Sequence, residues 1–233
     1  MSKCCSNIVF IKKMNITTQM IKKILLTLSI FFLYSNIVLA EKVIIFEFTA
    51  DEFKTLKVKK VKGVTTWLLG SNENGNFIKA EAEGKASGLG KEIKINLSKT
   101  PFINITWKIE KDLSGIVENS KKGHDYAARV FVIKKTGSTP LSNRAINYVF
   151  SSNNSINDSW PSPYTKKSID YVLSTTKNDL NTWVTVKANV KEHFKKLHDL
   201  NVKELSGVAI MTDTDNSKLK AIAFYQNIYF SSE

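Results

Sequence analysis

The residues best suited to chemistry fall on two segments that alternation predicts to be strands. In residues 123–131, a period of two places Asp125 and Arg129 on the face opposite Tyr126 and Val130, which we expect in the core. Residues 143–151 bring Asn147 beside Arg129 if the two strands pair across the short turn at 137–140. Carboxylate, guanidinium and amide groups bind sugar hydroxyls and carboxylates. The pattern predicts a trough on a concave sheet face that binds a ligand.

Small residues on the same faces strengthen this interpretation, because they leave room above the sheet. The last two predicted strands also carry them, and Tyr225 of the final strand is expected to reach the trough. An alternative is purely structural: the small residues accommodate a helix, and Asp125 with Arg129 forms an ordinary surface ion pair. Arg129 is one of only two Arg in the chain, with Arg144, so its planar fork is expected to clamp a carboxylate or to pair with a buried Asp.

A second candidate is the segment 211–217, where Asp213, Asp215 and Asn216 are closely spaced. Clustered carboxylate and amide oxygens suit a hard cation, so calcium is the only cofactor that the sequence suggests. The Gly and distal Glu of an EF-hand loop are missing, however. Asx side chains also close turns by bonding to their own backbone, and that alternative stays open.

A third candidate is the loop at 158–164, which contains two Pro as well as Trp160 and Tyr164. Stiff aromatic side chains on a loop can stack on sugar rings, and a Trp can equally fill the end of a β-sandwich. Signals for an enzyme are weak. His124, Arg129 and Tyr148 are the residues with which a polysaccharide lyase or hydrolase would work, but no nucleophile elbow, phosphate-binding loop or paired-histidine motif occurs.

The elements that position these residues are short and mostly extended. One helix is predicted near 189–200, capped by Asn189, with Val190, Phe194 and Leu197 on its apolar side. Many short strands separated by polar turns indicate an all-β, jelly-roll-like antiparallel β-sandwich. Eleven runs read as strands: 43–48, 64–69, 77–82, 92–97, 102–109, 126–133, 145–150, 169–173, 183–188, 205–211 and 221–230.

The N-terminal part of the 233-residue chain predicts export. Residues 20–40 have the basic start, apolar centre and small-residue cleavage site of a signal peptide, with cleavage after Ala40. Residues 1–19 then precede the true start, and 41–233 form a single domain with no stable membrane span. Both cysteines, Cys4 and Cys5, lie upstream, so the mature chain has none, which suits a periplasmic or secreted protein.

The excess of positive charge does not indicate nucleic-acid binding. The chain carries 34 Lys and Arg against 21 Asp and Glu, a net charge of +13. The cations are almost all Lys, spread over every segment, whereas recognition of nucleic acids relies on clustered Arg. A glycan or another acidic envelope polymer is therefore the expected partner.

Several of these segments together resemble an exported bacterial family known only as a domain of unknown function, DUF3047. The resemblance covers most of residues 43–230 and implies export and a continuous β fold, with no established activity. The sequence thus predicts a glycan-binding envelope protein, with a polysaccharide-active enzyme and a purely structural envelope protein as the alternatives. The resemblance rests on 107–109, 124–130, 145–149, 160–164, Trp183 with 189–190, 207–216 and 223–225.

Overall fold

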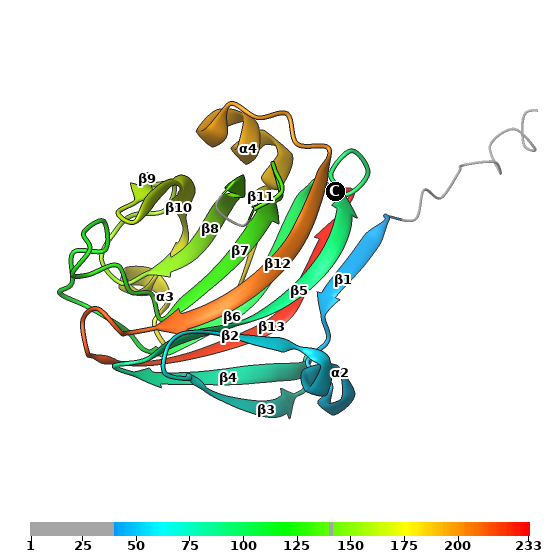
Figure 1. The fold of residues 1–233 in the computed structure, drawn as a ribbon. Helices are drawn as coiled ribbons and strands as arrows, with labels where there is room; N and C mark the ends of the chain where they lie inside the picture. Colours follow the sequence, from blue (N-terminus) through cyan, green and yellow to red (C-terminus); the bar gives the residue numbers. More distant parts are fainter. Residues whose placement is uncertain (1–39, 140–141) are drawn as a thin grey trace, which may run out of the picture. The chain divides into compact units, whose positions relative to one another are not determined.

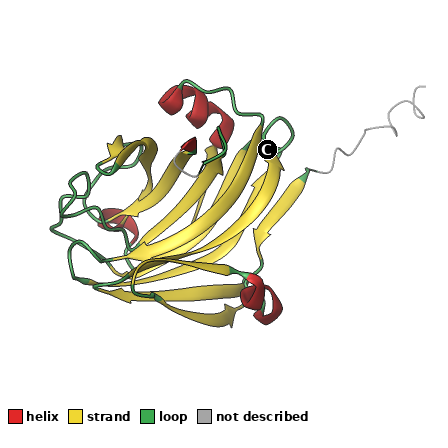
Figure 2. Ribbon diagram, viewed as in Figure 1, coloured by secondary structure: helices red, strands yellow, loops and turns green. Residues whose placement is uncertain are grey.

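A computed structural model describes residues 40–139 and 142–233. The predicted signal peptide, except Ala40, and the segment before it lie outside the described residues. The described chain folds into two packed β-sheets with a few short helices, as Figures 1 and 2 show. No helix within these two ranges combines the length and the apolar character needed to cross a bilayer.

The smaller sheet has six strands, in the order β11-β6-β13-β4-β3, with β1 paired to β13. All of its pairs are antiparallel. The strands are β1 (Lys42–Phe46), β3 (Thr66–Asn72), β4 (Gly75–Glu83), β6 (Phe102–Lys111), β11 (Val184–Asn189) and β13 (Lys220–Ser231).

The larger sheet has seven strands, in the order β2-β5-β12-β7-β8-β10-β9. Its β7 and β8 form the predicted hairpin, but β8 and β10 run parallel, so the expectation of a wholly antiparallel sandwich is wrong at this pair. The strands are β2 (Lys57–Lys62), β5 (Ala86–Asn96), β7 (Ala128–Lys134), β8 (Arg144–Ser151), β9 (Ser159–Ser162), β10 (Thr165–Thr175) and β12 (Glu204–Asp213).

The core lies between the two sheets and is built by alternate residues of each strand. Val130 of β7 and Tyr148 of β8 point inward from the larger sheet, and Trp107 of β6 and Tyr225 of β13 point inward from the smaller one; all four are 0% exposed. The Trp107 indole donates to Ser174 Oγ at 3.0 Å, which satisfies its one polar atom. The two sheets and the observed strand ranges confirm the sandwich and its eleven predicted strands.

Two strands and two helices escaped the sequence patterns. β2 reads Lys-Val-Lys-Lys-Val-Lys and is exposed throughout, so burial imposes no alternation on it. β9 contains Pro161, which is tolerated because β9 is an edge strand. The helices α2 (Ala50–Thr55) and α3 (Thr176–Asp179) are too short to show a helical period.

The predicted helix is α4 (Val190–His198), which lies at the top of Figure 1 beside β8 and β11. Asn189 caps it by accepting a hydrogen bond from the Glu192 amide at 3.2 Å, and Asp199 ends it in a left-handed conformation. Val190 and Phe194 are buried in the core, as predicted. The two histidines of α4, His193 and His198, lie outside the predicted apolar side, yet both contact the larger sheet.

His193 of α4 stacks on Tyr171, with the ring centroids 4.3 Å apart, and its Nδ1 lies 3.1 Å from the Tyr148 hydroxyl. Burial, assisted by the positive charge of Lys196, lowers the pKa of His193 from 6.5 to about 4. His198 Nε2 lies 2.9 Å from the Ala145 carbonyl oxygen, and burial lowers its pKa also. These two histidines therefore pack against the larger sheet, while the Lys and Glu side chains of α4 are exposed.

The lowered pKa of His193 predicts a loss of stability in mild acid. Between pH 6.5 and pH 4 the unfolded chain protonates this imidazole and the folded chain does not, so the free energy of unfolding falls as the pH is lowered through this window. We expect His193→Gln to flatten that dependence, with a residual slope from His198. Urea unfolding at pH 7, 5.5 and 4 measures it, and an unchanged slope in the variant would refute the assignment.

Candidate functional site

The outer face of the larger sheet, turned away from the smaller sheet, carries the candidate site. Register aligns one residue from each of its seven strands into a single row. Because neighbouring strands lie about 4.8 Å apart, the row extends for about 29 Å. In order across the sheet it contains Lys57, Gly90, Ala209, Phe131, Asn147, Asp170 and Trp160, and we call it the outer row.

The middle of the outer row is partly open to solvent. Gly90, Ala209 and Phe131 are half-buried, so an aromatic ring stands next to small residues. A Cβ atom on Gly90 would meet its nearest neighbour, Ala209 Cβ, at 3.6 Å, so this glycine is not forced by crowding. Gly88 in the adjacent row differs, because a Cβ there would lie 2.8 Å from the Ile210 carbonyl oxygen. Small residues thus flank Phe131 on this face, but those expected from the final strand, Ala221 and Ala223, are buried between the sheets.

Beside this open part, loops cover the outer face. Tyr126, Val149, Val172 and Trp160 form a second, smaller apolar cluster there. The segment before β7 and the loop after β12 are tied together, because Asp125 accepts hydrogen bonds from the Asn216 and Ser217 amides at 3.2 and 2.5 Å. Tyr126 was predicted to share the inward face of Val130. It lies on the outer face because the β7 ladder begins only at Ala128.

Arg129 points to the outer face as predicted, but it is not available to a ligand. The side chain is 4% exposed and its guanidinium pairs bidentately with Asp213, with Nε 2.8 Å from Oδ1 and the second bond between Nη2 and Oδ2. Burial lowers the pKa of Arg129, while the neighbouring Asp170 and Asp125 carboxylates oppose that shift. The structure corrects the expected Asp125–Arg129 surface pair to a buried Arg129–Asp213 pair, which the sequence had left open.

Asp170 is the centre of a buried polar group at the far end of the outer row. Its carboxylate accepts from Asn147 Nδ2 at 2.6 Å and from the Tyr126 hydroxyl at 3.2 Å, and it lies 2.7 Å from His124 Nε2. The contact with the carboxylate fixes the orientation of the Asn147 amide, and its Oδ1 has no partner among the described residues. Burial and the Asp170 charge raise the pKa of Tyr126 above its ordinary value of 10.

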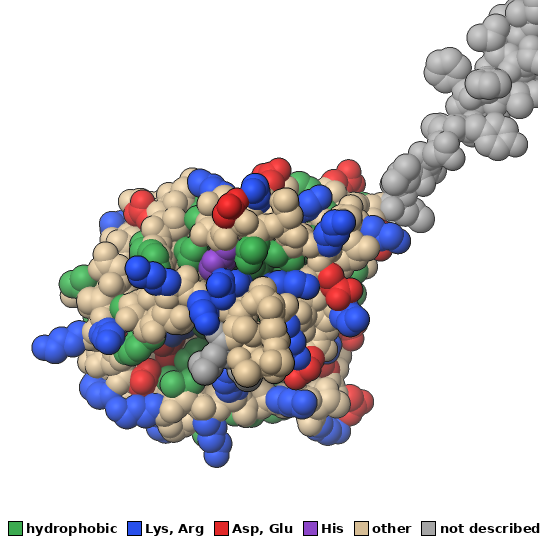
Figure 3. All heavy atoms as spheres, turned by 45° about the horizontal axis from the view of Figure 1, so that its top comes forward, with side chains coloured by type: hydrophobic (Ala, Val, Ile, Leu, Met, Phe, Trp, Pro, Cys, Tyr) green, Lys and Arg blue, Asp and Glu red, His purple; other side chains and the backbone are tan. Residues whose placement is uncertain are grey.

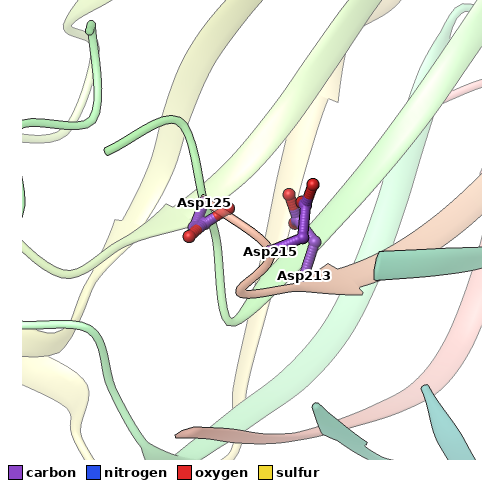
Figure 4. A group of neighbouring side chains, drawn as sticks. All are labelled: Asp125, Asp213 and Asp215. Atoms are coloured by element: carbon purple, nitrogen blue, oxygen red, sulfur yellow. The ribbon is translucent and has the colours of Figure 1, made fainter. Parts of the chain in front are cut away.

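Three carboxylates of the predicted cation segment and its neighbourhood come together at one end of the sheet (Figure 4). One oxygen each of Asp125, Asp213 and Asp215 lies within 4.8 Å of the others. Asp213 is already neutralised by Arg129, and Asn216 turns its amide toward Asp125 at 2.8 Å. Asp215 is the carboxylate of the three that remains partly exposed. Calcium at this cluster stays a prediction.

Trp160 and Tyr164, predicted on one loop, lie on different features. Trp160 is half-buried in β9 and packs on the outer apolar cluster. Tyr164 is 57% exposed, packs edge-on against His124 and donates to Asn216 Oδ1 at 2.6 Å. Only Trp160 reaches the outer row.

Tyr225 does not join the site. The sequence analysis allowed β12 and β13 to share a sheet, but β13 belongs to the smaller one, and Tyr225 is 0% exposed in the core. Its hydroxyl donates to the Met211 carbonyl oxygen at 2.6 Å and accepts from the Arg129 amide at 3.2 Å. Tyr225 therefore links β7 and β12 from the core side of the larger sheet.

The sequence analysis missed four residues of the outer row, namely Lys57, Gly90, Phe131 and Asp170. Phe131 and Lys57 carried a usable signal, since Phe131 alternates with Val130 and Val132, and Lys57 opens a Lys-rich run. Asp170 interrupts the apolar run at 169–173, and a carboxylate in such a run predicts a buried polar group. Nothing local predicted that these residues share one row, because the order of strands in the sheet aligns them.

Comparisons with solved structures return other β-rich proteins. A family 30 carbohydrate-binding module of Clostridium thermocellum has 8% identity and a TM-score of 0.48, covering 83% of this chain and 98% of that one. The xyloglucanase domain of NopAA from Sinorhizobium fredii has 10% identity and a TM-score of 0.43, covering 76% and 92%. A cellulase derived from Rhodothermus marinus Cel12A has 9% identity and a TM-score of 0.40, covering 84% and 97%. Because all three TM-scores are below 0.5, the ligands and reactions of these proteins are not assigned to this chain.

No curated protein matches the sequence. The family model described as "Protein of unknown function (DUF3047)" matches residues 51–229, which include every strand of the larger sheet and all of the outer row. The expected resemblance is confirmed over more than half of the chain, and the protein therefore belongs to the DUF3047 family.

Proposed function

We propose that this protein is an exported glycan-binding protein whose ligand lies along the open part of the outer row. The observation that carries the proposal is the position of Phe131, a half-buried ring between Ala209 and Asn147 on a sheet face. An aromatic plane bordered by small residues and a few polar groups suits a sugar ring.

The surroundings of Phe131 support the same interpretation. The Arg129 guanidinium lies 5.6 Å from the centre of the Phe131 ring, a cation–π contact that helps to hold the ring in place. The neighbouring Asn147 is 0% exposed, so it lies beneath the surface that a sugar would occupy, and its Oδ1 is not counted as a ligand contact. Asp170 and Asp213, the buried carboxylates of this face, are both engaged by donors, which favours binding over hydrolysis.

Calorimetric titration of the purified protein with glycans selected on an array tests the proposal. Phe131→Ala is expected to weaken binding about tenfold, because a stacking contact contributes about 1–1.5 kcal/mol. Gly90→Val, whose Cβ would lie in ordinary contact at 3.6 Å from Ala209 Cβ, is expected to weaken binding because the larger side chain takes up space in the outer row. Phe77→Ala is the matched control, since Phe77 is half-buried on the outer face of the smaller sheet, against Phe224. Absence of glycan binding, or equal affinities of the Phe131 and Phe77 variants, would refute the proposal.

One observation favours a polysaccharide-active enzyme as the second candidate. His124, 7% exposed, is paired to Asp170 at 2.7 Å, an arrangement that orients an imidazole for acid–base chemistry. An enzyme would release new chain ends from the bound glycan, and His124→Gln would abolish that release while the protein stays folded. A binding protein retains its affinity in the same variant and releases no product.

A further inference from the structure

The strand at one edge of the larger sheet carries a concentrated and unneutralised positive charge. β2 contains Lys57, Lys59, Lys60 and Lys62 within six exposed residues. Elsewhere in the described ranges eight lysines have a carboxylate oxygen within 4.0 Å. None of the four lysines of β2 is among them. Eight of the 23 other lysines in the described ranges are paired in this way, so β2 is distinguished by placing four lysines within six residues and not by the lack of pairing alone.

Register brings this charge to the proposed site. Lys57 pairs with Gly90 and so begins the outer row, and Lys59 pairs with Gly88 in the adjacent row. Side chains at positions of one row share a face, so Lys57 and Lys59 border the same face as Phe131. Lys57 lies three strands from Phe131, or about 14 Å in Cα position. A polymer lying on Phe131 and continuing along the row reaches these two ammonium groups.

At the end of β2 a second feature concentrates positive charge. The Lys62 side chain contacts that of Lys218, and this contact is the main cause that lowers the pKa of Lys218. Two ammonium groups held together repel each other, and the charges of Asp215 and Asp125 near Lys218 offset part of that repulsion. Lysines on an exposed edge also prevent pairing with a foreign strand. That role needs charge of either sign, and it does not explain why Lys218, from another loop, joins the group.

We infer that the ligand of the outer row is an anionic polysaccharide whose carboxylates contact Lys57 and Lys59 while a sugar ring lies on Phe131. The inference rests on the proposed function and adds the chemical class of the glycan. Lys57 and Lys59, at the edge of the sheet, attract an anionic ligand. Glu92 lies nearby but does not cancel this attraction, because its carboxylate is paired with Lys135 at 3.3 Å. Figure 3 shows how widely Lys and Arg side chains are spread on one side of the molecule.

The test compares acidic polysaccharides with their charge-neutral forms. Polygalacturonate, alginate and hyaluronan are each titrated into the purified protein beside the methyl ester of the same polymer. At least one acidic polymer is expected to bind, its ester at least tenfold more weakly, and its affinity to fall as NaCl is raised from 50 to 300 mM. Lys57→Gln/Lys59→Gln should weaken the acidic polymer about tenfold and leave its ester unaffected. Lys94→Gln/Lys99→Gln, which removes two exposed lysines that face Glu204 and Glu41, should change neither.

The outcomes separate this inference from the proposed function. If an ester or a neutral glycan binds as tightly as the acidic polymer, and Phe131→Ala weakens both, the glycan site stands and the anionic selectivity is overturned. If no glycan binds at all, the proposed function itself fails. Duplex DNA bound as tightly as the acidic polysaccharide would show attraction by charge alone and would also overturn the inference.

Discussion

Asp213→Asn is expected to lower the free energy of unfolding by about 3–5 kcal/mol, because it leaves the buried Arg129 guanidinium without its counter-charge. Arg129 is 4% exposed and Asp213 is 1% exposed, so water cannot replace the lost carboxylate. The Asn side chain has nearly the shape of Asp, so the loss reports charge and hydrogen bonding and not a cavity. Urea unfolding monitored by tryptophan fluorescence measures it at pH 7.

Two matched variants make this result interpretable. Asp215→Asn, two residues away and partly exposed, is expected to change stability by no more than about 0.5 kcal/mol. Arg129→Met/Asp213→Leu removes both charges together and is expected to recover most of the loss, since a buried pair costs much of its attraction in desolvation. A loss below 1 kcal/mol in Asp213→Asn would show that Arg129 is solvated in solution.

The same variants decide the calcium hypothesis. If calcium binds the cluster, millimolar calcium raises the melting temperature of the native protein by mass action, and Asp215→Asn removes the increment without disturbing Arg129. Asp213 is unsuitable for this purpose because its loss destabilises the fold. A melting temperature that does not respond to calcium would assign the clustered oxygens of Asp125, Asp215 and Asn216 to turn formation.

Asp170→Asn is expected to lower the free energy of unfolding by about 3 kcal/mol. The wild-type carboxylate is hydrogen-bonded to Asn147, Tyr126 and His124 simultaneously. In the variant, an amide replaces one of its two acceptor oxygens with a donor. At least one buried donor then faces another donor, and each buried group left unsatisfied costs about 1–3 kcal/mol. Chemical denaturation against the wild type measures the change.

Asp158→Asn provides the control, since Asp158 is exposed and its side chain accepts one hydrogen bond, from the Ser155 amide at 2.9 Å. His124→Gln should cost clearly less than Asp170→Asn, because the Gln amide can still donate to the carboxylate. If His124→Gln proves as damaging as Asp170→Asn, the imidazole and not the carboxylate organises this cluster.

Alternation along the chain was sufficient to predict the sandwich. Once one side of a strand must face a core, period two fixes which residues point inward, and this succeeds for Val130, Ile146 and Tyr148. The hairpin of β7 and β8 also followed, because a short turn leaves two successive strands few other partners. The cap and apolar side of α4 are local features and were predicted for the same reason.

The failures begin where strands distant in the sequence choose partners. Local pattern does not state that β13 belongs to the smaller sheet or that its small residues face the core, so Tyr225 was expected on the outer face and lies on the inner one. Period two also stops being informative where a ladder ends, and Tyr126, two residues before β7, therefore turns to the opposite face. Both errors come from long-range pairing, which no window of neighbouring residues contains.

The sequence by itself determined the fold class, the outward direction of Arg129 and Asn147, and the oxygen-rich turn after β12. Only the tertiary structure decided that Arg129 forms its ion pair with Asp213, because that contact joins β7 to the end of β12 across 84 residues of chain. It also decided that Lys57, Phe131 and Asp170 lie in one row. Strand order and register are set by the packing of the whole sheet, and they alone bring residues from seven separate strands into one line.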